Sequence, residues 1–291
     1  MRYLDALSLR ELLPIARAIE EISGAFGPDC EVPQRLSLNG AKVMPARVGD
    51  DMGVKIVSLT PGDPAGLVVI FGSDGRPMGI VDGPALTALR TGAASGLATK
   101  LCAAPDAPVL AVFGSGAMAR DQVAAVRAVR PIDKVLVWSR TLERSRLLAE
   151  EIGGTAVVDP DEAARAADII VTATPAKRPL FAAEALAETV HINAIGAYRP
   201  DMVEVPAEVV RRAWVVVDSH VAAQVEAGDL ISAGRTADAE MGDILNGSAT
   251  PPRSGITLFK TSGIASMDVV MARAALRLAD AVGAGQVVGP S

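Results

Sequence analysis

The sequence predicts an α/β protein, with a doubly wound parallel sheet in its second part and a smaller α+β region before it. Three observations lead to this prediction: short β-rich runs over 31–82, strand–helix alternation after residue 105, and a core poor in aromatic residues. The 291 residues are 50% hydrophobic but only 3% aromatic, so Ala, Val, Leu and Ile must fill the interior. Such a core suits parallel strands covered by helices on both faces.

The first part of the chain is expected to contain a helix, four strands and a second helix. Residues 8–26 place apolar side chains at helical spacing, with Pro14 in the early turns, where its ring is tolerated best. Asp74-Gly75 between two apolar runs predicts a hairpin, and the Ala- and Gly-rich 83–103 predicts a closely packed helix. The four strand-like runs are KVMPARV (42–48), GVKIVSL (53–59), GLVVIFG (66–72) and PMGIVDG (77–83).

Five continuous apolar runs follow residue 105, with helical segments between most of them. They are VLAVFG (109–114), KVLVWSR (134–140), DIIVTAT (168–174), VHINAIG (190–196) and AWVVVDS (213–219). Residues 255–281 add a strand-like run and a long helix that is free to return to the first part. We therefore expect one domain from 1–104 and 264–291, and a second from 105–263.

Composition and charge exclude several classes of function. A net charge of −6 argues against a nucleic-acid surface, and no apolar run is long enough to span a bilayer. The N-terminus is interrupted by charges and does not resemble a signal peptide. Two cysteines and two histidines offer neither a disulfide framework nor a His-based metal cluster. These features indicate a cytoplasmic enzyme without a metal.

A G-x-G-x-x-A turn at 114–119 joins the first of the five runs to a predicted helix. Gly114 permits the tight turn, Gly116 lets the backbone approach a pyrophosphate, and Ala119 lets the helix contact the strand. Selection for packing alone is the alternative for an isolated motif, but here the turn opens a series of parallel-type strands. The turn therefore predicts a Rossmann-type dinucleotide site. Its expected cofactor contacts are Gly114, Ser115, Gly116, Ala117 and Met118.

The end of the second run indicates which dinucleotide is bound. An NAD site usually has an acidic residue there, whereas this chain has Ser139, Arg140, Thr141 and Arg144. The planar guanidinium of Arg140 is suited to a 2′-phosphate. We expect NADPH to be preferred and NADH to be the alternative cofactor, unless these residues form only a solvated basic loop.

Two further strand ends complete the predicted cofactor site, because ligands bind beyond the carboxyl edges of such sheets. The residues at these ends are Thr172, Ala173, Thr174, Ile195 and Gly196. His191 lies between Val190 and Ile192 and is interpreted as a core histidine rather than a catalyst.

Over nearly its whole length the chain resembles the ornithine cyclodeaminase/μ-crystallin family. The matching segments are VPQR (32–35), MPARV (44–48), GVKIVS (53–58), ALRTGAASGLAT (88–99), GSGAMA (114–119), INAIGAYRPDMVEV (192–205), VVVDS (215–219), EAGDL (226–230) and TLFKTSGIASMDVV (257–270). The resemblance implies a Rossmann domain plus a discontinuous domain that contacts substrate and forms a homodimer.

The resemblance also places Arg35, Lys55 and Arg90 in the substrate site. Two arginines suit a substrate carboxylate, and an ammonium in the apolar run of Lys55 is costly unless it faces a polar cavity or a partner. Ordinary salt bridges are the alternative for each residue taken singly.

Two positions depart from the cyclodeaminase pattern. Tyr198 stands where that branch has an aspartate, and a phenol with a reference pKa of about 10 is a poor base at neutral pH. Lys42 stands where a glutamate would contact the distal amine of the substrate, and a lysine would repel it. Both changes favour the ketimine reductases of the family.

The sequence therefore predicts an NAD(P)H-dependent reductase of a small imino acid, such as Δ1-pyrroline-2-carboxylate giving proline. The predicted catalytic residues are Lys55, Arg90, Arg35 and Tyr198, with Lys55 as first candidate for the proton donor and no acidic base among them. Alternatives are amination of a 2-oxo acid, as in alanine dehydrogenases, ornithine cyclodeamination, and a non-catalytic crystallin-like protein that binds NADPH and a small ligand.

Overall fold

The computed structural model describes residues 1–60 and 65–289, and the chain divides into two compact units. Unit 1 contains residues 1–94 and 263–291, and unit 2 contains residues 95–262. The division falls within helix α3 (Gly83–Cys102), which matches the helix predicted over 83–103. The domain boundary expected after residue 104 stays a prediction.

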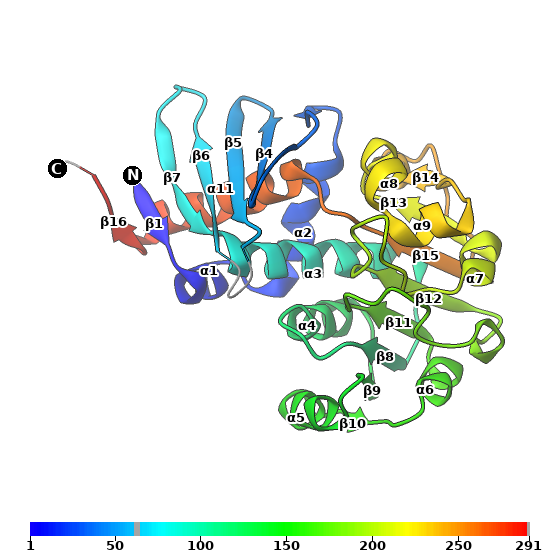
Figure 1. Cartoon of the computed structure of the whole chain (residues 1–291). Helices are drawn as coiled ribbons and strands as arrows, with labels where there is room; N and C mark the ends of the chain where they lie inside the picture. The colour runs from blue at the N-terminus through cyan, green and yellow to red at the C-terminus, as the bar shows by residue number, and fades with distance from the viewer. Residues whose placement is uncertain (61–64, 290–291) are drawn as a thin grey trace. The chain divides into compact units, whose positions relative to one another are not determined.

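Unit 1 is built on a mostly antiparallel sheet with the strand order β16-β1-β7-β6-β5-β4-β2, to which β3 adds by pairing with β4 (Figure 1). Its strands are β1 (Arg2–Leu4), β2 (Cys30–Glu31), β3 (Leu36–Leu38), β4 (Ala41–Val48), β5 (Asp51–Ser58), β6 (Gly66–Phe71), β7 (Pro77–Asp82) and β16 (Gln286–Val287). The hairpin predicted at Asp74-Gly75 is confirmed: Gly75 has φ of 74° and joins antiparallel β6 and β7.

The single helix predicted over 8–26 is wrong. Pro14 divides this segment into α1 (Ala6–Leu12) and α2 (Ile15–Glu21), and a 3-10 turn η1 (Ile22–Phe26) follows. The helix begins at Ala6, where Asp5 caps it by accepting from the Ser8 amide at 2.8 Å. Pro14 therefore comes beyond the first turn of the helix. There it has no backbone N–H to donate, and its ring clashes with the preceding turn.

Helix α11 (Ala265–Val282) covers one face of the unit 1 sheet, as Figure 1 shows. Its buried stripe consists mostly of small and flexible residues, which permits close packing on the strands: Ala265, Met267, Met271, Ala272, Ala275 and Ala279. The last helix therefore returns to the first part of the chain, as the sequence predicts.

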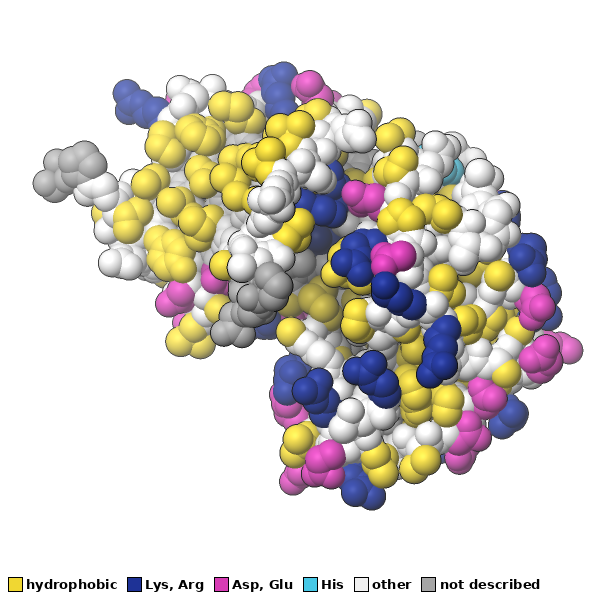
Figure 2. Space-filling view, viewed as in Figure 1, with side chains coloured by type: hydrophobic (Ala, Val, Ile, Leu, Met, Phe, Trp, Pro, Cys, Tyr) yellow, Lys and Arg dark blue, Asp and Glu magenta, His cyan; other side chains and the backbone are white. Residues whose placement is uncertain are grey.

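The opposite face of this sheet is apolar and open. Met52 and Ile56 on β5 and Leu67 on β6 are 45–49% exposed, and Ile56 lies directly beside Leu67 in the register. Figure 2 shows hydrophobic side chains gathered over strands β4 to β7. Large contiguous apolar patches are uncommon on the surfaces of monomeric proteins.

Unit 2 contains the doubly wound parallel sheet that the sequence predicts, in the order β10-β9-β8-β11-β12-β15-β13-β14. Its strands are β8 (Val109–Phe113), β9 (Lys134–Trp138), β10 (Thr155–Ala156), β11 (Ile169–Thr172), β12 (Val190–Ala194), β13 (Trp214–Val217), β14 (Ala239–Glu240) and β15 (Ile256–Lys260). Its other elements are α4 (Ala119–Val129), α5 (Leu142–Ile152), α6 (Pro160–Ala166), η2 (Ala183–Ala185), α7 (Ala207–Arg212), α8 (His220–Glu226), α9 (Gly228–Ala233) and α10 (Met241–Leu245).

Both faces of this sheet are buried. Along β8, Leu110 and Val112 belong to one apolar cluster, whereas Ala111 and Phe113 belong to another. Successive side chains of a strand point to opposite faces, so the two clusters are the two covered layers. This explains why the strands read as continuous apolar runs.

The described residues lack two features, a membrane-spanning helix and a metal-binding cluster of acidic, His or Cys side chains. None of their helices is both long enough and apolar enough to cross a bilayer. They also hold no group of three or more His, Cys, Asp and Glu side chains placed to bind a metal ion.

Candidate functional site

The glycine turn of unit 2 begins where β8 ends, and its first residue must be glycine. Gly114 has φ of 117°, and a Cβ there would lie 2.5 Å from the carbonyl oxygen of Ala173. The Gly114 amide also donates to the carbonyl of Trp138 at 2.8 Å. Any side chain at this position would be strained and would push the turn away from β11.

The second glycine leaves the backbone open. A Cβ on Gly116 would meet no atom within 4 Å, and Gly116 and Ala117 are exposed, with Ser115 and Met118 half-buried. Ala119 is fully buried against the core as α4 begins, and no side chain caps that helix start. An open backbone at an uncapped helix N-terminus fits a dinucleotide's pyrophosphate.

The end of β9 carries exposed cations. The Ser139 hydroxyl donates to the Thr141 carbonyl at 2.7 Å, which shapes the loop between β9 and α5. The side chains of Arg140 and Arg144 are exposed and make no hydrogen bond or ion pair within the described part of the chain. They are available to an anionic ligand.

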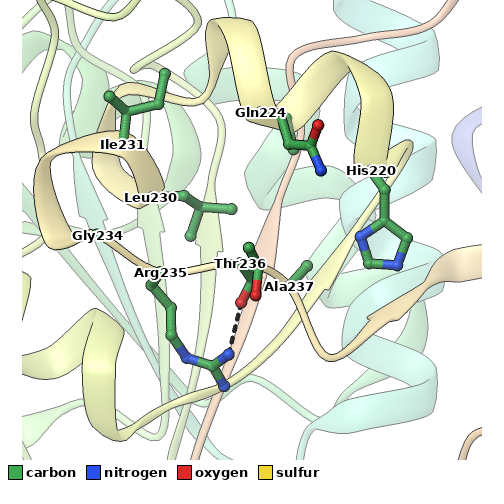
Figure 3. A pocket seen from close by; sticks show the side chains of 9 residues that line it. His220, Gln224, Leu230, Ile231, Gly234, Arg235, Thr236 and Ala237 are labelled. Atoms are coloured by element: carbon green, nitrogen blue, oxygen red, sulfur yellow. Dashed lines mark hydrogen bonds between the residues drawn. The ribbon is translucent and has the colours of Figure 1, made fainter.

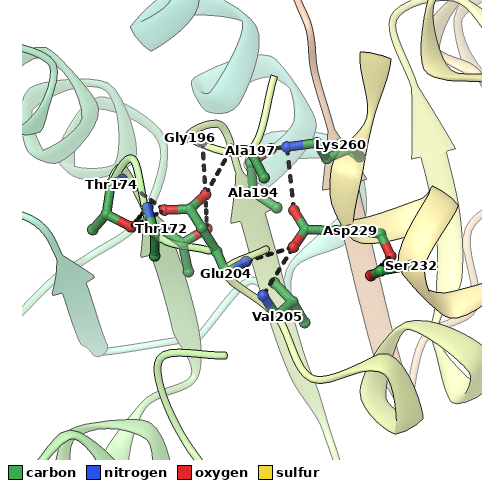
Figure 4. A network of polar contacts seen from close by, with 11 residues as sticks. Thr172, Thr174, Ala194, Gly196, Ala197, Glu204, Val205, Asp229, Ser232 and Lys260 are labelled. Atoms are coloured by element: carbon green, nitrogen blue, oxygen red, sulfur yellow. Dashed lines mark hydrogen bonds and ion pairs between the residues drawn. The ribbon is translucent and has the colours of Figure 1, made fainter. Parts of the chain in front are cut away.

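The carboxyl ends of β11 and β12 are tied together by a buried acid that the sequence prediction missed (Figure 4). Glu204 is fully buried, and its carboxylate accepts hydrogen bonds from the hydroxyls of Thr172 and Thr174 at 2.9 and 2.7 Å. It also accepts from the backbone amides of Thr174, Gly196 and Ala197 at 2.6–3.1 Å. Burial raises the pKa of the Glu204 carboxyl, while Lys260 and the Thr174 donors oppose that rise.

Glu204 is itself held by a second buried acid. Asp229 Oδ1 accepts from the backbone amides of Glu204 and Val205 at 2.7 and 3.0 Å, and its Oδ2 faces Lys260 Nζ at 3.3 Å. Lys260 Nζ also donates to the Ala194 carbonyl at 3.2 Å. We call Glu204, Asp229 and Lys260 the strand-end network. The sequence feature that could have indicated this network is Lys260, a lysine at the end of the apolar run TLFK.

The cofactor residues predicted at the ends of β11 and β12 lie around this network. The Thr172 hydroxyl is fully buried and donates to Glu204, so it supports the strand end from within. Ala173 and Gly196 are half-buried, and Ile195 is buried. Their contact with a cofactor stays a prediction.

Unit 1 brings the predicted cations together. Lys55 Nζ and Arg90 Nε lie 3.0 and 3.3 Å from the same oxygen, Oδ1 of Asp268 in the first turn of α11. The side chains of Lys55 and Asp268 are 4% and 1% exposed. The prediction that these cations have no acidic base beside them is therefore corrected by Asp268. The sequence SMDVV did not indicate a site residue, because Asp is common in the first turn of a helix.

Arg35 is linked to this group by a hydrogen bond to the backbone just before α11. Its Nη2 donates to the Gly263 carbonyl at 2.6 Å, and a Cβ on Gly263 would lie 2.5 Å from both terminal nitrogens of Arg90. Gly263 has φ of 77°, so glycine is needed there for conformation and for space. We call Arg35, Lys55, Arg90 and Asp268 the cation cluster.

Lys55 is the titratable group of the cation cluster. Its pKa is lowered to about 8, mainly by burial and to a smaller extent by the positive charges of Arg90 and Arg35, while Asp268 opposes this shift. A lysine with a pKa near the working pH can both hold and release a proton.

The remaining predicted residues have separate surroundings. Tyr198 lies in the loop after β12 and is 45% exposed, so its predicted catalytic role has no buried partner to support it. Lys42 is half-buried on β4, opposite Val57. The reading of His191 as a core residue is confirmed: it is buried, its Nδ1 lies 2.9 Å from the Thr257 hydroxyl, and burial lowers its pKa to about 4.

Unit 2 also has a surface cavity of about 280 Å³ beside α8 and α9 (Figure 3). Its lining includes His220, Gln224 and Arg235, and it contains none of the predicted cofactor residues. The guanidinium of Arg235 is already bonded to the Thr236 carbonyl and to Asp238, so it does not offer the cavity a free cation.

The chain combines a glycine turn in a parallel sheet with a cation cluster around Asp268 of α11, and it matches a known family. The family model for the ornithine cyclodeaminase/mu-crystallin family matches residues 25–279. The chain belongs to this family. The resemblance seen in the sequence motifs is therefore confirmed.

One curated family member is the Δ1-pyrroline-2-carboxylate reductase of Bacillus cereus, which is 40% identical over 210 residues. The match covers 67% of this chain and 64% of that relative. This chain thus aligns with less than two thirds of the relative's length.

Solved structures of the family extend the likeness to the whole fold. A Δ1-pyrroline-2-carboxylate reductase of Thermococcus litoralis in complex with NADH and L-proline superposes with a TM-score of 0.92 at 30% identity, covering 99% of this chain and 100% of that one. An archaeal alanine dehydrogenase dimer with bound NAD gives a TM-score of 0.91 at 26% identity, covering 99% of both chains. The α/β fold with a Rossmann-type sheet and a separate, mostly antiparallel sheet is that of the family.

Proposed function

We propose that this chain is an NAD(P)H-dependent reductase that converts a small cyclic imino acid, such as Δ1-pyrroline-2-carboxylate, into the amino acid. The observation that carries the proposal is the cation cluster, in which buried cations outnumber the one buried acid. Such a site favours an anionic substrate with a second polar group. The relatives named for pyrroline-2-carboxylate reduction support this reading.

The residues of unit 1 bind and orient the acid. Arg90 contacts Asp268 through Nε, and its terminal nitrogens form no ion pair with a described carboxylate, so they can grip the substrate carboxylate. Arg35 adds a second guanidinium, which is held by its hydrogen bond to the Gly263 carbonyl. Fixing the carboxylate fixes the neighbouring imine carbon, and orientation of this kind supplies much of a rate enhancement. Lys55 is the candidate donor of the proton that the imine nitrogen takes up.

The residues of unit 2 hold the dinucleotide. The turn Gly114–Met118 receives the pyrophosphate on its open backbone, and the strand ends at Ala173 and Gly196 bound the nicotinamide side. A bound reduced nicotinamide supplies the hydride. The reaction needs the cation cluster to face that ring.

The cofactor preference is for NADPH, with NADH as the alternative. The exposed cations Arg140 and Arg144 at the end of β9 support this, because a guanidinium pairs well with a 2′-phosphate. The structures of relatives named above contain NADH or NAD, so we expect this chain to use both cofactors with different affinities.

The functional form is a homodimer in the cytoplasm. The exposed apolar face of the unit 1 sheet, with Met52, Ile56 and Leu67, supports pairing with a second copy, and the alanine dehydrogenase relative is a dimer. Analytical ultracentrifugation should give twice the chain mass of 29.9 kDa. A monomer at micromolar concentration would contradict this part of the proposal.

The activity is tested by steady-state oxidation of NADPH and NADH with Δ1-pyrroline-2-carboxylate and a panel of cyclic imines. We expect saturable turnover without added amine. Turnover only of 2-oxo acids with added ammonia or methylamine would instead assign an amination. Ammonia release from ornithine without net cofactor change would assign cyclodeamination, and cofactor binding without any turnover would assign a crystallin-like protein.

A further inference from the structure

Asp268 occupies an unusual electrostatic position in unit 1. One carboxylate oxygen, Oδ1, takes both Lys55 Nζ and Arg90 Nε, whereas Oδ2 is buried and has no hydrogen-bond partner among the described residues. Burying an ion without full pairing costs several kcal/mol in general. Burial of Asp268 is therefore destabilising, because the hydrogen bonds of the cluster leave Oδ2 unpaired.

Another buried acid of the same unit provides the comparison. Asp51, at the start of β5, is also nearly buried and also accepts from two arginines, Arg273 and Arg277. Both of those arginines lie on α11, and one of them is 61% exposed. Asp51 therefore joins a strand to a helix at the edge of solvent, as a structural ion pair does, whereas Asp268 joins two buried cations.

The groups around Lys55 come from three elements besides its own strand. Asp268 faces it from α11, Arg90 and the Thr87 hydroxyl from α3, and Arg35 from the segment before β3. The residues paired with Lys55 on the neighbouring strands, Met44 and Val68, are apolar. Asp268 is thus the acid that offsets two guanidiniums at the ammonium.

We propose that Asp268 is a positioning residue of the reaction, which orients Lys55 and Arg90 together and keeps Lys55 in its ammonium form as the proton donor to the imine nitrogen. This inference rests on the proposed function. In the step, the N–H bond of Lys55 breaks and a new N–H bond forms on the substrate nitrogen, while the imine carbon accepts a hydride from the reduced nicotinamide. Lys55 is left as a neutral amine, which solvent reprotonates.

The first test measures the proton on Lys55 directly. The chain has six lysines, at positions 42, 55, 100, 134, 177 and 260, so NMR of protein labelled with ¹³C at lysine Cε gives few resonances. The Lys55 signal is assigned by its loss in Lys55→Met. In Asp268→Asn we expect its titration midpoint to fall by about one pH unit or more, because the opposing charge is gone.

Two further variants separate positioning from general damage. Asp51→Asn removes a buried acid of the same unit and should leave the Lys55 midpoint unchanged. Asp268→Glu keeps the charge and should titrate closer to the wild type than Asp268→Asn does. If Asp268→Asn does not fold, Asp268→Glu still decides, because its longer side chain moves the carboxylate. A Lys55 midpoint shifted by a fraction of a pH unit supports the proposal, and a midpoint equal to that of the wild type together with an unchanged kcat/KM overturns it.

The second test is the pH profile of kcat/KM. The fall at alkaline pH should follow the Lys55 midpoint in the wild type and move to lower pH by the same amount in Asp268→Asn. If neither the pH profile nor the NMR midpoint moves in Asp268→Asn, the proposed role of Asp268 is overturned, while the proposed function is not. Absence of turnover in the wild type overturns the proposed function, and the NMR midpoints still decide what Asp268 does to Lys55.

Discussion

The two units each bury a lysine against an aspartate, yet the two networks are built differently. In unit 2, Lys260 faces Asp229 at 3.3 Å, and in unit 1, Lys55 faces Asp268 at 3.0 Å. The strand-end network surrounds its acids with donors, since Glu204 alone accepts from three backbone amides and two hydroxyls. In the cation cluster two buried cations face one buried acid, the reverse of the charge balance in the strand-end network. Asp268 Oδ2 and Asp229 Oδ2 both lack a hydrogen-bond partner among the described residues, but Asp229 Oδ1 accepts from two backbone amides, whereas Asp268 Oδ1 accepts from Lys55 and Arg90.

The comparison teaches that buried charge alone does not identify a functional site. The strand-end network has two buried carboxyls and one lysine, and backbone amides donate to both carboxyls, so this network fixes the backbone. The cation cluster has an excess of buried positive charge, which favours the binding of an anion. We therefore propose that the strand-end network supports the cofactor edge and that the cation cluster binds the substrate.

The largest expected effect follows from removing a cation of the cluster. Arg90→Met should lower kcat/KM about 1,000-fold, or ~4 kcal/mol, because the substrate carboxylate loses its paired donor and Asp268 loses one of its cations. Steady-state kinetics with the imine substrate measures this. Arg277→Met, which removes a largely exposed arginine of α11, should change it less than twofold. A loss under tenfold in Arg90→Met would place the carboxylate elsewhere.

The next effect concerns the strand-end network and appears in stability. Glu204→Gln should lower the free energy of unfolding by about 2–4 kcal/mol, since in either orientation the new amide group meets a backbone N–H. Urea unfolding followed by circular dichroism gives the value. Glu208→Gln on the exposed surface of α7 is the matched control and should stay within about 0.5 kcal/mol. Equal stabilities would mean that the network is not a structural support.

A third effect tests how strongly unit 2 rejects an unpaired charge. The pKa of His191 is lowered from 6.5 to about 4 by burial, so the unfolded chain binds the proton more readily between these values. Stability should therefore rise with pH from about 4 to 6.5, by up to ~3 kcal/mol from this group. His191→Asn should reduce that slope and His220→Asn should not. Identical slopes in unfolding titrations of all three proteins would contradict the assignment.

The smallest effect concerns the cofactor. Arg140→Ala should weaken NADPH binding about tenfold, or ~1.4 kcal/mol, while leaving NADH binding nearly unchanged, because only the 2′-phosphate loses a donor. Fluorescence titration of both cofactors measures this. The control for a general loss of positive charge is Arg146→Ala, because Arg146 is likewise exposed and lies on the neighbouring helix α5. If both cofactors weaken equally, Arg140 does not select between them.

The sequence predicted the fold well wherever local pattern and tertiary structure agree. Continuous apolar runs predicted the parallel strands of unit 2, and the hairpin at Asp74-Gly75 was predicted by its turn residues. The helix over 8–26 failed because apolar spacing continues through Pro14, whereas the backbone cannot. The spacing of apolar residues indicates which face of a segment is buried, but it does not indicate whether the backbone hydrogen bonds of a helix continue without a break.

The site was predicted only where residues carry a signal of their own. Lys55 was placed in the site by the family resemblance and supported by its position in an apolar strand, and Gly114 was recognised because a phosphate turn has a fixed spacing. Asp268 and Glu204 were missed, since their partners lie 213 and 32 residues away and no local pattern announces them. Long-range pairing of a buried acid is a tertiary property.

A crystal structure of the protein with NADPH and pyrrole-2-carboxylate, a planar mimic of the imino acid, tests the assignment of the cation cluster most directly. We predict the carboxylate within about 2.7–3.2 Å of a terminal nitrogen of Arg90, a further contact to Arg35, and the ring nitrogen nearest to Lys55. A carboxylate bound away from these residues, with the cluster unchanged, would contradict the account.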